Sequence, residues 1–457
     1  MDTKALRQKI LDLAIHGKLV PQDPNDEPAS VLLERIRVEK ERLIKEGKIK
    51  KGKKSAKTSD KPHYPFELPK GWCFTNIGEL LINRDGERKP VSSAIRSKQL
   101  NKIYDYYGAA GVIDKIDDYL FDEKLLLIGE DGANLLSKSK NNAFFAEGKY
   151  WVNNHAHVLD ATDKNLLEYV AIVINAIKLD DYITGSAQPK LSQDNLNKIP
   201  IVLPPLSEQK RIMEAIIHWS LLIEQIEQNK IDLQASIKQV KSKVLDLAIH
   251  GKLVPQDPND EPAIELLKRI NPKAEIITDN GHYQKLPDGW CLTILESIGT
   301  WQSGATPSRL RKDYYGGNIP WLKTGDLNDG IITNIPEFIT EKALKETSVK
   351  LNPTDSILIA MYGATIGKIG ILSFPATTNQ ACCACLDYKI DKMYIFYFLL
   401  SNRINFVSMG GGGAQPNISK EKIVNTTFPL PPLAEQKRIV SKIEELFHQL
   451  NMIEESL

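Results

Sequence analysis

The sequence predicts a two-headed protein, with two globular domains at opposite ends of a long antiparallel two-helix coiled coil and a pseudo-twofold internal repeat. The first observation is a 19-residue stretch, "LDLAIHGKLVPQDPNDEPA", which occurs identically at 11–29 and 245–263. The second is a set of further paired motifs at matching spacing. The third is a heptad pattern of apolar residues, which is typical of a long helix packed along one partner.

The duplication extends well beyond the identical stretch. The residues between the paired motifs, which we call the two inserts, show little resemblance to each other, whereas the motifs and helices around them, which we call the frame, are duplicated. This pattern predicts two modules that are attached in the same way and bind different targets. The pairs are "LPKGWC" at 68–73 with "LPDGWC" at 286–291, "GSAQPKLSQDNL" at 185–196 with "GGAQPNISKEKI" at 412–423, and "LPPLSEQKRI" at 203–212 with "LPPLAEQKRI" at 430–439.

The central helix is predicted from its apolar spacing. Pro204 and Pro205 precede it, Ser207 is a candidate N-cap and Gly251 follows its end. Lys230 fills the one polar place of the seam, where a buried polar group can fix register. The apolar places, alternately four and three apart, are Ile212, Ile216, Trp219, Ile223, Ile226, Leu233, Ile237, Val240, Val244 and Leu247.

The partner helix is predicted in two pieces, one at each end of the chain. Connectivity makes it antiparallel to the central helix, and forty-odd residues at ~1.5 Å each give a rod of roughly 65 Å. The C-terminal piece repeats the first half of the seam 227 positions later, and the N-terminal piece repeats the second half 234 positions earlier. The matching residues are Ile439, Ile443, Leu446, Leu450, Ile453 and Leu457, and then Leu6, Ile10 and Leu13.

Composition limits the class of protein. The chain is 42% hydrophobic with a net charge of +1, and it contains no apolar run of membrane-spanning length. The N-terminus lacks the apolar core of a signal peptide. Five cysteines, an odd number, favour a reducing compartment, so a cytoplasmic location is expected. The lysine-rich run at 45–61 is typical of a solvated linker, with phosphate contact as the alternative.

In their order and double occurrence the motifs resemble the specificity subunits of type I restriction–modification systems. The resemblance covers essentially the whole chain. It rests on "PPLSEQKRI" and "PPLAEQKRI", on the twice-written "LDLAIHGKLVPQDP", and on "LPKGW" and "LPDGW". Inside the inserts, "LIGEDGANLL", "NNHAHVL", "SGATPSR", "IPWLKTGDL" and "GGGGAQPNISKEKI" also look like that family.

The resemblance implies an α/β (α+β) fold class in which each insert is a target recognition domain of mixed α/β type. The implied organisation has seven segments. They are an N-terminal half-helix and repeat element at 1–44, a basic linker at 45–66, target recognition domain 1 at 67–206, the central helix at 207–251, a repeat element and linker at 252–285, target recognition domain 2 at 286–433, and a C-terminal half-helix at 434–457.

The resemblance also implies partners. Each domain would read one half of a bipartite double-stranded DNA site, and the rod would set the spacer. Two copies of a DNA adenine methyltransferase subunit, carrying S-adenosylmethionine, would bind the frame, and ATP-driven restriction subunits would join them. The identical stretch would then be a duplicated docking element, although recent duplication alone also explains it. The predicted docking residues are Leu13, His16, Leu19, Leu247, His250 and Leu253.

No catalytic motif is predicted. The sequence has no "[DN]PP[FYW]" motif of amino-methyltransferases and no "GxxxxGK[ST]" loop. "CCAC" at 382–385 lacks a second cysteine pair, so a buried strand is favoured over a zinc site. His155 and His157 alternate on one strand face without an evident third ligand. We therefore expect a non-catalytic subunit with no metal and no cofactor of its own.

DNA-binding candidates are chosen by residue type in polar, glycine-containing loops, because such side chains contact base edges and phosphates. The paired "GSAQPK" and "GGAQPN" loops, common to both heads, are expected to hold backbone or shape the loop rather than read sequence. The candidates are Lys138, Ser139, Asn154, His155, Gln188 and Lys190 in the first domain, and Thr306, Ser308, Arg309, Lys323, Thr324, Gln415 and Asn417 in the second.

Three alternative functions remain open at this point. One is the recognition subunit of a methylation-only system that has no restriction partner. Another is a stand-alone enzyme, which the missing methyltransferase motif argues against. The third is a symmetric scaffold that bridges two proteins without touching DNA.

Overall fold

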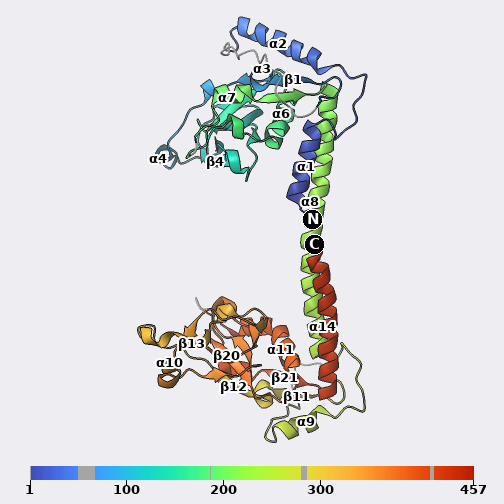
Figure 1. Ribbon diagram of the computed structural model, residues 1–457, viewed down its shortest axis with the longest axis vertical. Coiled ribbons are helices and arrows are strands. Elements are labelled where there is room, and N and C mark those ends of the chain that lie inside the picture. Colours follow the sequence, from blue (N-terminus) through green and yellow to red (C-terminus); the bar gives the residue numbers. More distant parts are fainter. Residues whose placement is uncertain (1, 50–66, 186, 279–285, 412–415) are drawn as a thin grey trace. The chain divides into compact units, whose positions relative to one another are not determined.

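The computed structural model describes residues 2–49, 67–185, 187–278, 286–411 and 416–457. Most of the basic linker predicted at 45–66 therefore lies outside the described residues. The chain divides into two compact units, Met1–Asn229 and Lys230–Leu457. Each unit combines a mixed α/β head with a pair of long helices, as Figure 1 shows. We call the heads head 1 (67–206) and head 2 (286–433).

Head 1 is built on two four-stranded sheets and a two-stranded ladder. The central sheet has the order β2-β9-β6-β7, and all its pairs are antiparallel. The second sheet has the order β4-β3-β8-β5, in which β3 and β8 are parallel. The strands are β1 (Cys73–Asn76), β2 (Ile82–Asn83), β3 (Tyr104–Gly108), β4 (Gly111–Ile116), β5 (Phe121–Asp122), β6 (Leu125–Gly129), β7 (Ala143–Ala146), β8 (Lys149–Val152), β9 (Ala156–Asp160) and β10 (Pro200–Leu203).

Head 2 repeats this topology strand for strand. Its central sheet, β12-β20-β17-β18, carries one additional strand, β14, and its second sheet is β15-β13-β19-β16 with β13 and β19 parallel. The strands are β11 (Cys291–Ile294), β12 (Thr300–Ser303), β13 (Tyr315–Leu322), β14 (Gly330–Ile332), β15 (Phe338–Ile339), β16 (Leu351–Asn352), β17 (Ile357–Ala360), β18 (Ile369–Leu372), β19 (Ala376–Thr378), β20 (Cys382–Leu386) and β21 (Thr427–Leu430).

Helices complete each head. The apolar helix α6 packs against the central sheet of head 1, and α11 does so in head 2. Head 1 and its N-terminal extension contain α2 (Ala29–Lys45), α3 (Ile77–Leu80), α4 (Ser93–Arg96), α5 (Asn134–Ser137), α6 (Asn165–Ala176) and α7 (Gln193–Lys198). Head 2 and the segment before it contain α9 (Ala263–Ile270), α10 (Glu341–Glu346), α11 (Lys392–Ser401), α12 (Arg403–Met409) and α13 (Lys420–Val424).

The two inserts share their strand topology although their amino-acid sequences show little similarity. The central strands β6 and β17 both read as short apolar runs, "LLLIG" and "ILIA", and both are fully buried. Buried strand positions accept many apolar residues of similar volume, so the apolar pattern persists while the residues themselves differ. The mixed α/β type expected for each insert is confirmed.

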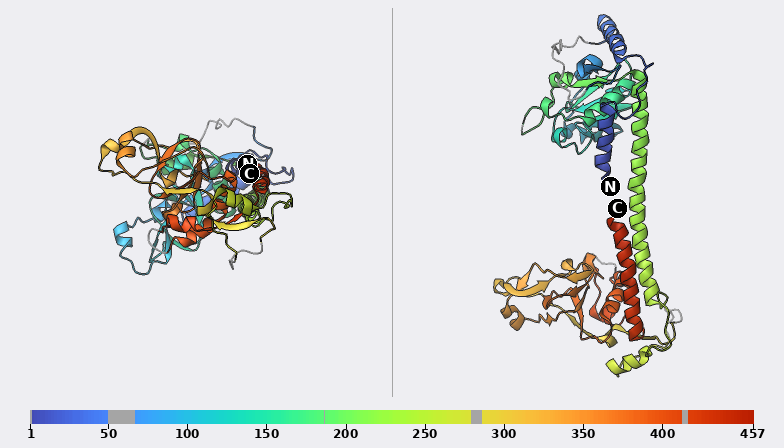
Figure 2. Two further views of the ribbon diagram at one scale, coloured as in Figure 1. Left: turned by 90° about the horizontal axis from the view of Figure 1, so that it is seen from below. Right: turned by 45° about the vertical axis from the view of Figure 1, so that its right-hand side comes forward.

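The central helix α8 (Leu206–Ile249) spans 44 residues, close to the predicted 207–251. In the first unit α1 (Thr3–Ile15) lies along it, with Arg7 paired to Glu227 at 3.1 Å. In the second unit α14 (Leu433–Glu455) lies along it, with Lys241 paired to Glu454 at 2.8 Å. Figure 2 shows both pairings. Both pairs are antiparallel. Gln22, beyond the end of α1, reaches Glu208 at the start of α8, and Lys230, earlier in α8 than Lys241, contacts Leu457, later than Glu454.

Only one row of the predicted heptad seam is covered. In this row Ile223, Ile237 and Val244 are at most 7% exposed, and Lys230 Nζ donates to the carbonyl oxygen of Leu457 at 2.6 Å. Ile212, which begins the other row, is buried too, but the four places that follow it keep 39–46% of their surface, so the prediction is wrong for them. A single partner helix covers one side of this stretch and leaves its flank open. The half-exposed residues, Trp219, Ile226, Leu233 and Val240, are called the α8 stripe.

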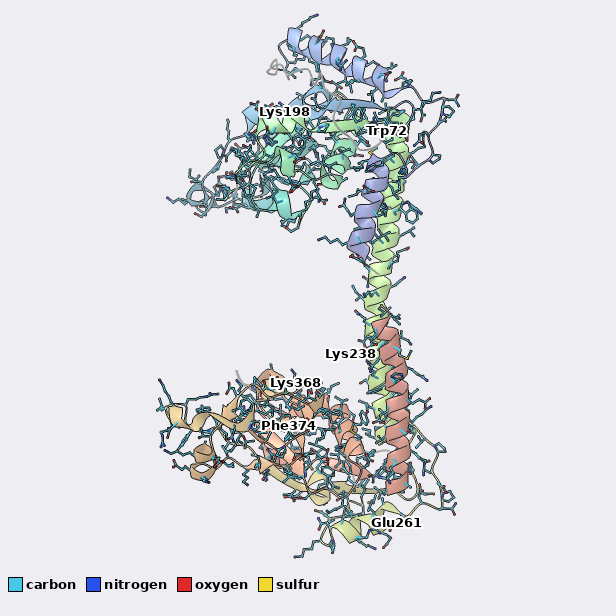
Figure 3. The ribbon with its side chains drawn as sticks, viewed as in Figure 1. Trp72, Lys198, Lys238, Glu261, Lys368 and Phe374 are labelled. Atoms are coloured by element: carbon cyan, nitrogen blue, oxygen red, sulfur yellow. The ribbon has the colours of Figure 1, made fainter. Side chains whose placement is uncertain are left out.

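The duplicated stretch forms a corner between each head and its helix. In head 1 the buried Glu208 accepts hydrogen bonds from Trp72 Nε1 at 2.9 Å and Gln22 Nε2 at 3.1 Å. Figure 3 shows Trp72 beside the first turns of α8. In head 2, Glu435 accepts from Trp290 Nε1 at 3.0 Å and Gln256 Nε2 at 3.1 Å. Burial raises the pKa of Glu435.

A second pair of contacts repeats in both corners. Arg211 pairs with Asp26 at 2.6 Å, and Arg438 pairs with Asp260 at the same distance. Contacts within its own unit therefore account for part of the identity of the duplicated stretch. These contacts cannot be seen in the sequence alone. The prolines, Asp and Asn of "PQDPN" remain exposed in both copies.

The corners predict a specific sensitivity to glycine substitution. Gly251 has φ +65°, and an added Cβ would lie 2.3 Å from Pro287 Cγ. Gly47 has φ +70° with nothing within 4 Å of an added Cβ. Both substitutions to Ala carry a left-handed backbone cost of roughly 1–2 kcal/mol, but only Gly251→Ala also displaces the corner. Thermal unfolding should therefore show a clearly larger loss of Tm for Gly251→Ala than for Gly47→Ala. Equal losses would contradict the close packing at the corner.

Candidate nucleic-acid interface

In head 1 three loops meet where β6 ends and β9 begins. The amide of Glu130 donates to the carbonyl of His155 at 2.8 Å, and the amide of Leu191 donates to the carbonyl of Glu130 at 2.7 Å. The amide of Gly132 donates to the carbonyl of Pro189 at 3.0 Å. The segment that follows β6 thus lies between the turn before β9 and the 184–191 loop. This arrangement brings the predicted residues His155, Gln188 and Lys190 to one side of the head.

The side chains at this junction are charged. His155 Nδ1 lies 2.7 Å from Asp131, and Lys190 Nζ lies 3.3 Å from Glu130. About half of each basic side chain is exposed, 48% for His155 and 54% for Lys190. Both basic groups are held by acidic neighbours while keeping an open face toward solvent. Such groups are positioned to contact phosphates or base edges.

A buried charged network lies beneath these loops. His157 is 1% exposed, with Nδ1 2.6 Å from Asp85 and Nε2 2.8 Å from the carbonyl oxygen of Leu191. A carboxylate and a carbonyl are both acceptors, so each ring nitrogen of His157 faces an acceptor. Arg88 pairs with Glu130 at 2.7 Å. Burial raises the pKa of Asp85, but hydrogen bonding and charge from His157, with Arg88, lower it below its ordinary value.

Sequence reasoning missed Asp85, Arg88 and Glu130 as members of this network. Glu130 lies inside the quoted motif "LIGEDGANLL", but nothing in the sequence pairs it with Arg88, 42 positions earlier. For His157 a structural or a DNA-facing role is expected ahead of a ligand role; the ring is buried and contacts the carbonyl oxygen of Leu191, which is a structural role. A buried acid, arginine and histidine far apart in sequence give no periodic signal.

Head 2 holds its equivalent loop with the same backbone hydrogen bonds. The amide of Gly363 donates to the carbonyl of Pro416 at 2.8 Å, and the amide of Ile418 donates to the carbonyl of Met361 at 2.9 Å. Tyr362 and Asn417 form an isolated bridge, as Asp131 and Lys190 do in head 1. The support beneath is neutral, because Met361 stands in the place of Glu130. Gln415 lies outside the described residues.

The sheet register gives a second neutral replacement. Cys383 faces Ile359 on β17, as His157 faces Ile128 on β6. The two heads therefore share the loop backbone and differ in the chemistry that supports and surrounds it. The described residues of the paired loops thus make the backbone hydrogen bonds that a role in shaping the loop requires.

Two further candidates of head 1 lie at another place. Lys138 Nζ donates to the carbonyl oxygens of Asn175 and Ile177 near the end of α6, and burial lowers its pKa. Ser139 Oγ donates to Asn134 Oδ1 at 2.9 Å. Asn154 is exposed in the turn before His155. DNA contact by these three residues stays a prediction.

In head 2 the remaining candidates gather around one carboxylate. Arg309 pairs with Glu337 at 3.0 Å, and Lys323 Nζ donates to the same carboxylate. The guanidinium lies over two aromatic rings, 4.4 Å from the centroid of Tyr315 and 5.0 Å from that of Trp321. The hydrogen bond from Lys323 lowers the pKa of Glu337. Thr306 and Ser308 lie on the loop that ends at Arg309, and Thr324 follows Lys323.

Neither metal chemistry nor a membrane span is indicated by the described part of the chain. It contains no group of three His, Cys, Asp or Glu residues able to hold a metal ion. Cys382, Cys383 and Cys385 are buried in β20, as the strand interpretation predicted, and burial raises the pKa of Cys383 to about 12. No described helix is long and apolar enough to cross a bilayer.

The repeat, the common head topology and the differing loops define a class of protein: a duplicated frame that carries two non-identical heads. Comparison with known proteins supplies the family. The model of the type I restriction modification DNA specificity domain matches residues 69–237 and 287–457. The chain belongs to this family, as its motifs predicted.

Two curated relatives match the chain over nearly its whole length. The type I restriction enzyme EcoAI specificity subunit of Escherichia coli is 28% identical over 98% of this chain and 90% of the relative. The EcoEI specificity subunit of the same organism is 28% identical over 99% and 90%. Both are specificity subunits, which confirms the prediction of a non-catalytic subunit.

Solved structures support the fold. The HsdS subunit from Thermoanaerobacter tengcongensis aligns with a TM-score of 0.53 at 15% identity, covering 86% of this chain and 93% of that one. A chain from a structure on complex assembly and conformational transition of the type I R-M system aligns at 0.51 with 16% identity, covering 86% and 94%. At these identities the likeness concerns the fold alone.

The buried network of head 1 predicts a pH-dependent loop. Asp85→Asn removes the buried carboxylate that contacts His157 and accepts from the amide of Val158, and it should destabilise the segment 189–191 by about 3–5 kcal/mol at pH 7. Because the folded-state pKa of Asp85 is lowered, its contribution is present above its ordinary pKa of about 4 and is lost as pH falls through the folded value. Hydrogen exchange of the Leu191 amide should thus differ between variant and parent at pH 7 and converge in acid.

The matched control is Asp105→Asn, which removes an exposed carboxylate paired with Lys115 on the second sheet. It should leave exchange at Leu191 unchanged. Equal protection of Leu191 in the Asp85→Asn variant and the parent at pH 7 would show that the network does not hold the loop.

Proposed function

We propose that this chain is the DNA-binding specificity subunit of a type I restriction–modification complex, with each head reading one half of a bipartite double-stranded DNA site. One observation carries the proposal. The two heads hold the segments 189–191 and 416–418 with the same backbone hydrogen bonds. Different side chains surround these segments, charged in head 1 and neutral in head 2. A shared frame with two different surfaces is what reading two different half-sites requires.

In head 1 the DNA contacts would come from His155 with the neighbouring Asn154, from Gln188 and Lys190 of the paired loop, and from Lys138 and Ser139 at another place on the same head. In head 2 they would come from Arg309, Lys323 and the residues of their loops, Thr306, Ser308 and Thr324, with Asn417 and Gln415. Arginine and lysine bind phosphates and guanine edges, and asparagine and glutamine bind adenine edges. The acidic partners Glu337 and Asp131 would orient these groups and release them to DNA.

The frame would dock two copies of a DNA adenine methyltransferase subunit that carries S-adenosylmethionine, one for each repeat. The predicted docking residues are half-buried in both copies, and His16 and His250 make the same backbone contact, to Asp12 and Asp246 at 2.6 and 2.7 Å. Leu19 and Leu253 pack against their own heads. The exposed "PQDPN" segments and the α8 stripe supply further surface, since exposed apolar rows on a helix are typical of protein interfaces.

ATP-driven restriction subunits would complete the complex. A system that only methylates, without a restriction partner, would use this chain in the same way. The distinction depends on the partner proteins and not on the heads described here.

Helix α8 would set the spacer between the half-sites, because it is continuous across the two units. A seven-residue insertion at its middle adds about 10 Å of helix and keeps the α8 stripe on one face. That extension corresponds to about three base pairs at ~3.4 Å each. The methylated motif should therefore keep both half-sites and gain about three base pairs between them. An unchanged gap would contradict a spacer role for α8.

The proposal is tested by mapping adenine methylation in a host genome with long-read sequencing. This chain and its methyltransferase partner are expressed together and singly. A two-part motif with a fixed gap, methylated only when both are present, is the expected result. Both proteins soluble and bound to each other, with no methylated motif and no affinity for duplex DNA, would favour a protein-bridging scaffold instead.

DNA affinity should also fall steeply with salt. Each phosphate contact neutralised by Lys or Arg releases a counterion, so the logarithm of the affinity falls by about 0.9 per contact for each logarithm of salt. In the complex with the methyltransferase subunit, Arg309→Ala should reduce the magnitude of this slope by about 1. The affinity is measured by fluorescence anisotropy at salt concentrations from about 50 to about 200 mM. Arg269→Ala, which removes an exposed arginine of α9 paired with Glu261, serves as the control.

A further inference from the structure

Each head presents one leucine that is almost entirely exposed. Leu100 is 96% exposed in the connection between β2 and β3 of head 1. Leu310 is 94% exposed in the connection between β12 and β13 of head 2. These connections, 84–103 and 304–314, join equivalent strands of the two heads. A single exposed leucine is common on protein surfaces, but its recurrence in the equivalent connection of two heads with little sequence resemblance calls for a physical cause.

The connection in head 1 is held by a cluster of four side chains. The guanidinium of Arg96 lies 4.3 Å from the centroid of the Tyr106 ring, and Arg96 Nε donates to Asp114 at 2.8 Å. Lys102 Nζ donates to the same carboxylate at 3.1 Å. The hydroxyl of Tyr106 accepts a hydrogen bond from the amide of Val91 at 2.9 Å. We call such a cluster an arginine clamp.

Head 2 contains the same clamp with different residues. Arg309 lies 5.0 Å from the centroid of the Trp321 ring and pairs with Glu337 at 3.0 Å. Lys323 donates to the same carboxylate. Trp321 Nε1 donates to the carbonyl of Ala305 at 3.1 Å, which ties the ring to the backbone of the connection as Tyr106 is tied in head 1.

Sheet register confirms that the ring and the acid of the two clamps occupy one place in the fold, while the lysine precedes the strand in head 1 and follows it in head 2. Tyr106 faces Trp151 on the parallel strand β8, and Trp321 faces Thr377 on the parallel strand β19. The acid comes from the opposite neighbour in both heads: Asp114 faces Tyr106 on β4, and the carbonyl of Glu337 accepts from the amide of Trp321 just before β15. Tyrosine is replaced by tryptophan and aspartate by glutamate, so the correspondence rests on structure rather than on sequence identity.

The clamp fixes a loop that holds its leucine side chain almost fully exposed. Stacked arginines and doubly paired carboxylates restrict the loop, and a preorganised loop binds with less entropic loss. Leu100 and Leu310 gain nothing from this ordering in the isolated protein, since both remain almost fully in water. Their burial must therefore come from a partner.

The charge of the two connections identifies that partner as DNA. Residues 84–103 contain six basic and two acidic residues, and residues 304–314 contain three basic and one acidic, although the whole chain has a net charge of only +1. Lys98 and Lys312, two positions from each leucine, are exposed. A basic loop with an apolar apex fits a duplex, because lysines contact phosphates while leucine meets a thymine methyl group or enters a base step.

We propose that Leu100 and Leu310 are paired apolar probes, each held by its arginine clamp and inserted into the groove of the half-site that its own head reads. The proposal rests on DNA reading as the function of the heads. It adds a contact that carries no charge and makes no hydrogen bond, and so lies outside the polar candidates considered above.

The test uses the full chain bound to its methyltransferase subunit. Leu100→Ala and Leu310→Ala are compared with Leu351→Ala, which removes a leucine that is 49% exposed on β16 of head 2. Affinity is measured for a duplex that carries the mapped site and for duplexes with either half-site scrambled, at several salt concentrations. Leu310→Met, which keeps an apolar side chain of similar volume, is the rescue variant.

Each alanine variant should bind the intact site about tenfold more weakly, within the range of roughly 5- to 150-fold that one base contact supplies. Discrimination should fall for the half-site of the altered head and stay unchanged for the other. The salt slope should not change, because leucine neutralises no phosphate. Leu351→Ala and Leu310→Met should bind within about twofold of the parent, the ordinary limit for a volume-conserving or distant exchange.

Three results would overturn the proposal. Parent-like affinity and discrimination in both alanine variants would show that the leucines do not touch the bases. Loss of the methyltransferase subunit from either variant, with the remaining complex still folded, would assign the leucine to a protein contact. A parent complex that binds no duplex at all would remove the DNA-reading function together with this inference, whereas the first two results leave that function intact.

Discussion

The structure depends on a buried carboxylate at the start of each long helix. Glu208 and Glu435 lie in the first turns of α8 and α14, and each accepts hydrogen bonds from an indole and a glutamine amide of its own unit. The indole belongs to the first segment of the head, and the amide belongs to the duplicated stretch. One carboxylate therefore joins head, helix and repeat element. An uncompensated buried carboxylate is costly, so its donors must be kept together. This constraint explains why the corners of the two units match in residue and in distance.

In the heads, away from these two corners, fewer positions require one particular residue. The central strands need only apolar side chains of suitable volume, and the loops need only the backbone hydrogen bonds that both heads share. Head 1 supports its loop with a charged network around His157, whereas head 2 uses Met361 and Cys383 at the equivalent places. The arginine clamps follow the same rule, with Tyr106 replaced by Trp321. A fixed frame with exchangeable side chains allows two heads of one fold to present different surfaces.

Much of the fold could be predicted, and less of the site. The 44-residue helix α8, its two partner pieces and the family followed from spacing and repeated motifs. The prediction of a fully buried seam failed for Trp219, Ile226, Leu233 and Val240, because heptad spacing places residues on a face without saying what covers that face. The structure brings the loops of His155 and Lys190 together and pairs Arg309 and Lys323 with one carboxylate, which side-chain type alone does not indicate. Lys138 binds the end of α6, which no local pattern indicates.

The sequence by itself determined the repeat, the helical frame and the family, because a duplication and a heptad period can be read directly from the order of the residues. Only the tertiary structure decided that the two inserts share one strand order, that Asp85 lies against His157 72 positions later, and that Tyr106 and Trp321 occupy one place in the two heads. The reason is physical. Contacts between distant residues depend on strand order and register, and strands of a buried sheet specify apolar volume rather than particular residues.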